Sequence, residues 1–76
     1  METINELTVN GAPNGHTKQY YYNDGDLAIK IPFTFWAGLE VSGNLYIYSD
    51  VRISGFLEVT GKIHVRNGRL TVVPKV

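Results

Sequence analysis

The sequence predicts an all-β protein in which an N-terminal β-hairpin region precedes a short β-helix or β-prism of six-residue repeats, completed by trimerisation. The repeats are the first reason, because from Leu39 onward the chain runs LEVSGN, LYIYSD, VRISGF, LEVTGK and IHVRNG. Each unit opens with an aliphatic, a variable and an aliphatic residue. Composition is the second reason, since Asn-Gly and Asp-Gly pairs separate segments rich in Val, Ile, Tyr, Phe and Thr, as between strands.

The 76 residues are interpreted as a single domain with two parts. Residues 1–37 are expected to supply a loop, a hairpin and the contacts with partners, and residues 38–76 the repeat stalk. A domain of this size buries only about 60% of the surface that its unfolded chain exposes. The chain has no cysteine, so neither disulfides nor thiolate metal sites can stabilise it. Oligomerisation is a usual way for so small a chain to complete its core.

The first part begins, within residues 1–17, with one short apolar alternation and the turn-rich sequence NGAPNG. A β-hairpin over residues 18–37 is predicted next, with a two-residue turn at Asp24-Gly25. Asp-Gly favours the positive φ angles that a type I′ turn needs at both central residues. After the turn, apolar residues alternate through LAIKIPFTF, as in a strand with one buried face.

The direction of the side chains decides whether the repeats form a meander of hairpins or a solenoid. A two-residue turn at Gly43-Asn44 would pair Ser42 with Leu45 and point both to one face, although Ser42 is an outward and Leu45 an inward position. Because strand side chains alternate with a period of two, successive hairpins would expose half of the core. Short strands that bend at each Gly or Ser and stack on a neighbouring coil or chain avoid this, so a solenoid is predicted.

The last repeat predicts a different ending. A two-residue turn at Asn67-Gly68 would pair Val65 with Leu70 and keep the alternation of side chains intact. We therefore expect a terminal hairpin over residues 62–73 that caps the repeats.

The repeats alone are too few to close a β-helix within one chain. Their inward positions are Leu39, Val41, Leu45, Ile47, Val51, Ile53, Leu57, Val59, Ile63, Val65, Leu70 and Val72. With three hexapeptides in each coil they give fewer than two coils, whereas repeat folds usually need three or more stacked units. Such coils would also place Glu40 beside Glu58, a mildly repulsive pair. Three chains that each supply one wall of a prism remove both objections, so we expect a homotrimer.

The LEVSGN, VRISGF and LEVTGK units resemble hexapeptide and β-helical segments of trimeric bacteriophage structural proteins, namely fibres, spikes and capsid decoration (cement) proteins. They are also similar to bactofilins, which are bacterial cytoskeletal polymers. The resemblance covers residues 38–73. It implies a virion structural protein, most specifically a homotrimeric decoration protein that stabilises the head, is assembled in the host cytoplasm and contacts capsid or other virion proteins. The alternatives are a tail-fibre or spike segment that binds carbohydrate and a bactofilin-like polymer.

The charges are balanced in number but uneven along the chain. Seven Lys and Arg residues stand against seven Asp and Glu, which argues against a nucleic-acid partner. Residues 1–38 are mildly acidic and residues 39–76 mildly basic, either by chance or because the ends or subunits are complementary. No stretch approaches the roughly 18 apolar residues of a membrane span, and the N-terminus lacks the regions of a signal peptide. Neither a membrane nor secretion is therefore expected.

The two histidines offer no catalytic or metal site. His16 and His64 lie far apart, no cysteine or acidic cluster stands at ligand spacing, and His64 falls on an outward position of its repeat. Neither a Ser-His-Asp arrangement nor a phosphate-binding glycine loop followed by a helix can be argued. We expect no enzyme activity, no cofactor and no metal.

The aromatic residues are the best candidates for binding, because such side chains bury large areas and favour interfaces. The predicted interface residues are Tyr21, Trp36, Phe56, Tyr46 and Tyr48. The first three are favoured because the alternation points them away from the main core face. A local core under the first hairpin and a platform for sugars are the alternative interpretations.

Overall fold

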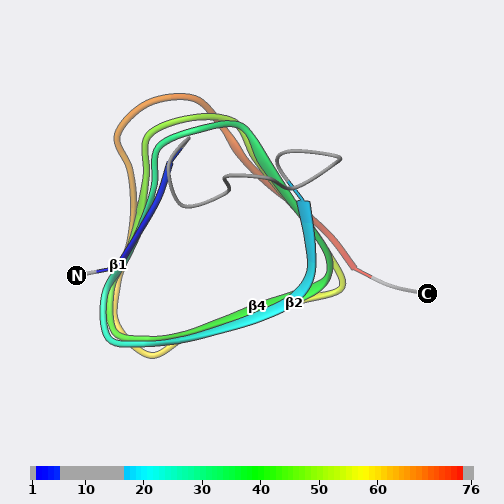
Figure 1. The fold of residues 1–76 in the computed structure, drawn as a ribbon, viewed down its shortest axis with the longest axis horizontal. Coiled ribbons are helices and arrows are strands. Elements are labelled where there is room, and N and C mark those ends of the chain that lie inside the picture. The colour runs from blue at the N-terminus through cyan, green and yellow to red at the C-terminus, as the bar shows by residue number, and fades with distance from the viewer. Residues whose placement is uncertain (1, 6–16, 75–76) are drawn as a thin grey trace.

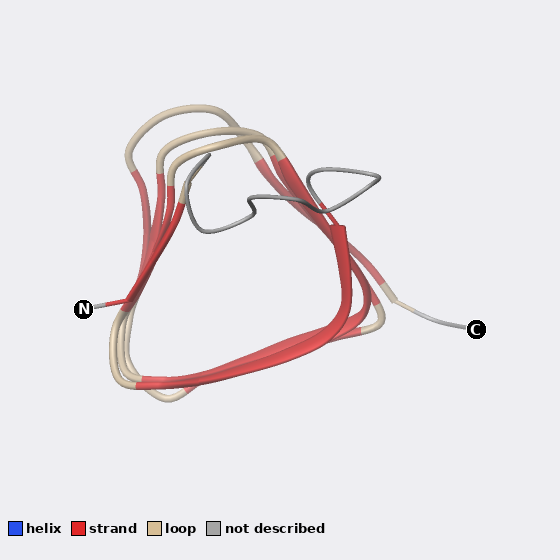
Figure 2. Ribbon diagram, viewed as in Figure 1, coloured by secondary structure: helices blue, strands red, loops and turns tan. Residues whose placement is uncertain are grey.

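A computed structural model describes residues 2–5 and 17–74 of the chain, and these residues form a β-solenoid of about three turns. Seen down the shortest axis, the coils lie over one another as a triangle (Figure 1). Strands lie along its sides, loops form two of its corners, and the third corner is turned mainly by strand (Figure 2). The described strands are β1 (Glu2–Ile4), β2 (Thr17–Asp24), β3 (Leu27–Ile29), β4 (Phe33–Ser42), β5 (Leu45–Ile47), β6 (Val51–Ser54), β7 (Phe56–Val59), β8 (Ile63–Val65) and β9 (Leu70–Val73). The predicted all-β solenoid is confirmed.

The strands stack in parallel to make three walls. The first wall contains β1, β3, β5 and β8 in that order. The second wall contains residues 17–18 of β2, residues 33–35 of β4, then β6 and β9. The third wall contains residues 20–24 of β2, residues 38–42 of β4, and β7. The long strands β2 and β4 therefore each turn one corner of the triangle.

One coil spans three hexapeptides, as the registers show. In the first wall Leu27 pairs with Leu45 and Leu45 with Ile63, so that the same position recurs after 18 residues. Each hexapeptide thus contributes one short strand and one corner. The aliphatic-x-aliphatic pattern places two side chains of each strand inside the triangle and the one between them outside.

The corner before the first wall is held by contacts between successive coils. The side-chain oxygen Oδ1 of Asp26 accepts a hydrogen bond from the Asn44 amide at 2.8 Å, and Oδ1 of Asn44 accepts one from the Lys62 amide at 2.9 Å. Glycine is needed beside these oxygens, because a Cβ on Gly43 would lie 2.6 Å from Oδ1 of Asp26. A Cβ on Gly61 would collide with Oδ1 of Asn44 in the same way.

The hydrophobic core lies in the coils built from residues 27–53. Its buried members are Ile4, Leu27, Ile29, Ile31, Phe33, Phe35, Leu39, Val41, Leu45, Ile47, Val51 and Ile53. Half of the expected inward residues, those from Leu39 to Ile53, are therefore buried as predicted. Five other core members precede Leu39 in the segment from residue 27, so that segment belongs to the solenoid as well.

The predicted hairpin over residues 18–37 is wrong. Strand β2 pairs with β4 and strand β3 with β1 and β5, all in parallel. A type I′ turn needs positive φ at both central residues, but at Asp24-Gly25 only the glycine has it, with φ of 103°. The pair therefore forms a corner, where the buried Asn23 side chain donates hydrogen bonds to the carbonyl oxygens of Gly25 and Asp26 at 2.9 and 3.1 Å.

The predicted terminal hairpin over residues 62–73 is also wrong. Strand β8 pairs with β5 and strand β9 with β6, and both pairs are parallel. The alternation is kept across Asn67-Gly68 because this corner holds one extra residue: Val51 pairs with Leu70, a separation of 19 rather than 18 residues. An inserted corner residue and a two-residue hairpin turn produce the same alternation in the sequence.

The prediction that one chain forms fewer than two coils is also wrong. Because residues 17–37 also wind into the solenoid, one chain supplies all three walls of the triangle. Intertwined chains are not needed to close the prism. Association of three such prisms stays a prediction. The apolar alternation expected within residues 1–17, at Leu7 and Val9, lies outside the described residues.

Candidate functional site

Tyr21 does not point outward as expected. Its ring stacks on Phe35, with 6.3 Å between ring centroids, and it packs against the hydrophobic core. In the solenoid Tyr21 is in register with Leu39 and Leu57, which are inward positions. Burial raises the pKa of the Tyr21 hydroxyl, and the charge of Glu2 adds to the effect. Tyr21 is therefore a capping residue of the core rather than part of an exposed surface.

Three other aromatic side chains are exposed around the junction of the second and third walls. Tyr20, Trp36 and Phe56 are each 46% exposed, and we call them the aromatic patch. The Tyr20 and Phe56 rings lie 5.7 Å apart although one coil lies between their strands. Gly38 stands between them in register, and a Cβ there would lie 2.5 Å from the Phe56 ring. The ring contact thus depends on the missing side chain of Gly38.

Carboxylates border the aromatic patch on the third wall. The Tyr20 hydroxyl donates a hydrogen bond to Oε1 of Glu40 at 2.8 Å. Glu40 is in register with Tyr22 on one side and with Glu58 on the other, so the anticipated pairing of the two glutamates is present. The hydrogen bond to Glu40, followed by desolvation and the negative charges of Glu40 and Glu58, raises the pKa of Tyr20. This face is therefore both aromatic and acidic.

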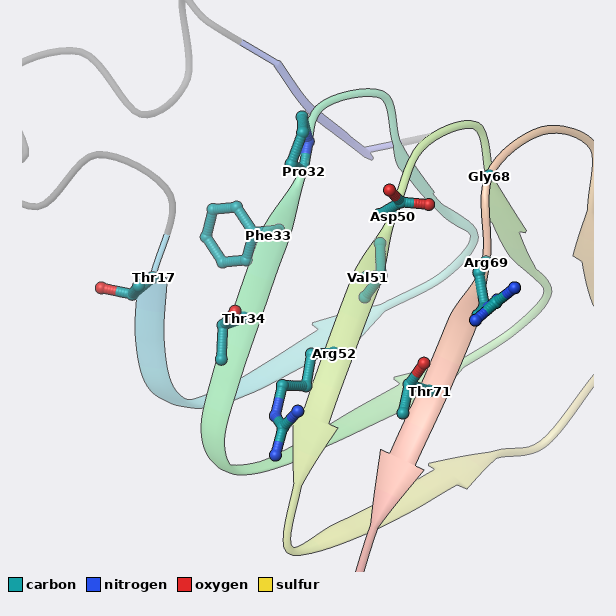
Figure 3. A pocket seen from close by; sticks show the side chains of 10 residues that line it. All are labelled: Thr17, Pro32, Phe33, Thr34, Asp50, Val51, Arg52, Gly68, Arg69 and Thr71. Atoms are coloured by element: carbon teal, nitrogen blue, oxygen red, sulfur yellow. The ribbon is translucent and has the colours of Figure 1, made fainter.

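The second wall carries a groove of about 1090 Å³ on its outer side. It is lined by Thr17, Pro32, Phe33, Thr34, Asp50, Val51, Arg52, Gly68, Arg69 and Thr71. Thr34, Arg52 and Thr71 stand in register on β4, β6 and β9, and Figure 3 shows them in one row across these strands. The lining offers hydroxyl and guanidinium donors to an oxygen-rich ligand. It includes one carboxylate, Asp50, and no histidine, cysteine or lysine.

The remaining predicted interface residues lie on or next to the first wall. Tyr46 is half-buried and stacks on His64, with centroids 4.9 Å apart and planes 8° from parallel. Tyr48 is 38% exposed, and the ammonium of Lys30 lies 5.3 Å from its ring centroid. His64 thus packs in a stack with Tyr46 on the first wall. Within residues 2–5 and 17–74 there is no group of three His, Cys, Asp or Glu that could hold a metal ion; His16 lies outside these residues.

The last coil leaves its inward side chains uncovered. Ile63, Val65 and Val72 are 43%, 49% and 41% exposed, whereas their register partners one coil earlier, Leu45, Ile47 and Ile53, are 0% exposed. Strands β7, β8 and β9 each have a coil on one side only among the described residues. We call this surface the open end. The sequence analysis expected a terminal hairpin over residues 62–73 to cap the repeats at this place, and no such hairpin forms.

Comparisons with protein-family models, curated proteins and solved structures gave no match. None of the described residues belongs to a helix that is long and apolar enough to cross a membrane. The functional interpretation therefore depends on the three surfaces described above: the aromatic patch with its carboxylates, the groove on the second wall, and the open end.

Proposed function

We propose that the protein is a structural component of a larger protein assembly, most specifically a virion decoration protein that binds its neighbours through the aromatic patch. The observation that carries this proposal is the exposure of Tyr20, Trp36 and Phe56 around one junction between two walls. Exposed aromatic side chains are enriched in protein interfaces and dominate their energetics. The exposed carboxylate of Glu58 beside them favours a partner surface that carries Lys or Arg.

Rigidity supports the same proposal. The patch stands on parallel strands that are anchored by the buried residues Phe35 and Leu39. The Tyr20 ring is held by Phe56 on one face and by the hydrogen bond to Glu40 at its hydroxyl. Because little side-chain freedom is lost on binding, a preorganised surface of this kind binds at a low entropic cost. A stiff module with such a surface suits a protein that joins or covers other subunits.

A homotrimer stays a prediction within this proposal, in a changed form. Because one chain closes its own prism, three copies would associate side by side rather than share a core. The aromatic patch is the surface that we assign to lateral contacts, either between copies or with a shell protein. Tyr46 and Tyr48, also predicted to be interface residues, lie on or next to another wall, and this proposal assigns no contact to them.

The direct test uses virus-like particles purified from the source of this sequence. Mass spectrometry of intact particles should detect the chain in a fixed ratio to the major shell protein. Recombinant protein should cosediment with particles from which it has been stripped, and a Trp36→Ala, Phe56→Ser variant should lose most of this binding. Tyr48→Ser, an equal change on another wall, should retain it. Particles without the chain, or full binding by the double variant, would reject the proposal.

A sugar ligand is the second candidate for the same patch. The exposed Trp36 ring near a hydrogen-bonded Tyr20–Glu40 pair offers an apolar platform and a polar acceptor, which together suit a sugar ring and its hydroxyl groups. Trp36 is the only tryptophan of the chain, so its fluorescence reports on this surface alone. Saturable quenching by an oligosaccharide, lost in Phe56→Ser, would support carbohydrate binding in place of a protein partner.

A further inference from the structure

The open end has the form of an interrupted stack. In the first wall, the Leu27 amide donates to the Asn44 carbonyl and the Leu45 amide donates to the Lys62 carbonyl, each at 2.9 Å, so these amides point toward the following coil. The repeat places the amide of Ile63 in the same direction, where the described residues provide no further coil. Unpaired strand edges of this kind readily pair with another chain.

The first coil presents the matching edges. It contains β1 in the first wall and β2 in the second and third walls, each with a coil on one side only among the described residues. All strands run parallel, so the first coil of a second copy can continue the same three walls in the same direction. Continuing the register places Val65 against Ile4 of the second copy and Leu57 against its Tyr21. Ile4 is only 4% exposed within its own copy, so the partly exposed Tyr21 offers the larger apolar contact to Leu57.

The charges of the two ends are opposite. Among the described residues, the last coil carries Lys62, Arg66 and Arg69 against a single carboxylate, Glu58. The first coil and its corner carry Glu2, Asp24 and Asp26 against a single cation, Lys18. Opposite potentials favour contact between unlike ends and disfavour contact between two open ends.

Lys62 is the residue of the open end that we expect to contribute most to this charge complementarity. In earlier coils the same corner position is held by Asp26 and Asn44, whose side-chain oxygens accept a hydrogen bond from the next coil. Lys62 has no acceptor to offer a following coil. Its ammonium instead suits an acidic edge, and the continued register brings Glu2 of a second copy next to Ile63.

We propose that the open end binds the first coil of a second copy of this chain, head to tail, so that copies stack into a column. The interface is heterologous and does not close on itself, so growth is limited only by concentration. The proposal goes beyond the proposed function, because it is argued from the free strand edges and the charges of the two ends. Phe56 and Tyr20 of the aromatic patch lie on these end strands, so the test uses Lys62 and Glu2, which lie outside the patch and leave the proposed function unchanged.

Sedimentation velocity of two charge-reversed variants and their mixture tests the proposal. The wild-type chain should rise in average mass above 8.5 kDa, and beyond a dimer, as its concentration increases, and salt should oppose this rise. Lys62→Glu and Glu2→Lys should each associate about tenfold more weakly or worse, because each places like charges across the interface. Their equimolar mixture should regain association, since every contact between unlike variants joins a glutamate to a lysine.

Three outcomes would overturn the proposal. A wild-type chain that stays monomeric at every concentration excludes stacking. An undiminished association of Glu2→Lys excludes the first coil as the partner and indicates contact between two open ends. A mixture that remains as weakly associated as the separate variants excludes the head-to-tail pairing. Circular dichroism of each variant checks the fold, and Tyr48→Ser, a change on the first wall away from both ends, should leave association unchanged.

Discussion

The middle and last coils of the solenoid carry the same apolar pattern but differ in how deeply it is buried. Leu45 in the middle coil is fully buried, whereas Ile63, its register partner in the last coil, is 43% exposed. This difference shows that the hexapeptide specifies which way a side chain points, whereas burial of that side chain requires a coil on both sides. The last coil is therefore folded but uncovered, and it should respond to substitution differently from the middle coil.

The largest contrast is expected from truncating the register partners Leu45 and Ile63. Leu45→Ala should lower the free energy of unfolding by about 3–5 kcal/mol, because it leaves a cavity in a core that cannot collapse around it. Ile63→Ala should cost about 1 kcal/mol, since the side chain is already partly in water. Urea denaturation of dilute protein measures both values. Equal losses would show that the last coil is as closed as the middle one.

Ile47→Val provides a milder version of the core change if Leu45→Ala does not fold. Removing one methylene from this buried residue should cost about 1 kcal/mol. Val65, its register partner at the open end, can be changed to Ala as the comparison. A smaller loss for Val65→Ala than for Ile47→Val, despite the larger truncation, is the expected order.

Substitutions of the corner glycines should lower the free energy of unfolding equally in the middle coil and in the last coil. A Cβ on Gly43 meets Asp26 and Gly25 of the preceding coil, and a Cβ on Gly61 meets Asn44 and Gly43. Both glycines are thus confined by the preceding coil, which is present for the middle coil and for the last coil alike. Gly43→Ala and Gly61→Ala should each cost about 2 kcal/mol in urea denaturation. A much smaller loss at Gly61 would mean that the last corner is not held against its neighbour.

A similar effect is expected within the aromatic patch. Gly38→Ala should cost about 2 kcal/mol, because a φ of 156° strains any residue other than glycine and because the Phe56 ring must move away from the new methyl group. In a Phe56→Ala background the same substitution should cost less, which a double-mutant cycle measures. Additive losses would show that Gly38 is not required by the ring of Phe56.

The smallest predicted effect is a change in tyrosine ionisation. The pKa of Tyr20 is raised above its usual value near 10, mainly by the hydrogen bond to Glu40. A raised pKa stabilises the fold below pH 10, and this contribution is lost as the pH rises through the raised value. Glu40→Gln should lower the pKa of Tyr20, as followed by ultraviolet absorbance at alkaline pH. Tyr20→Phe identifies the titration step, and an unchanged step in Glu40→Gln would contradict the assignment.

Much of the fold was predictable because the apolar spacing is regular. The repeats correctly indicated short strands that bend at Gly or Ser, and the alternation argument correctly excluded a meander. The same spacing extends back through Leu27 and Ile29 and then Phe33 and Phe35, where the Asp24-Gly25 pair suggested a hairpin instead. A local turn signal thus concealed the start of the solenoid, and with it the third coil.

The candidate site was less predictable because it depends on contacts between coils. Tyr20 and Phe56 are two coils apart in the sequence, and their contact follows only from the register through Gly38. Tyr21 was assigned outward because the hairpin reversed its face. The exposed positions Trp36 and Phe56 were correctly expected, since outward positions in a strand do not depend on what lies inside.

Amide hydrogen exchange at Leu45 and Ile63, measured at low and high protein concentration, tests the account most directly. The Leu45 amide, bonded to the Lys62 carbonyl, should exchange slowly at both concentrations. The Ile63 amide should exchange fast in dilute solution and slow down as copies stack. Fast exchange of the Leu45 amide in dilute solution would contradict the closed single-chain solenoid. An exchange rate of the Ile63 amide that is independent of protein concentration would contradict stacking at the open end.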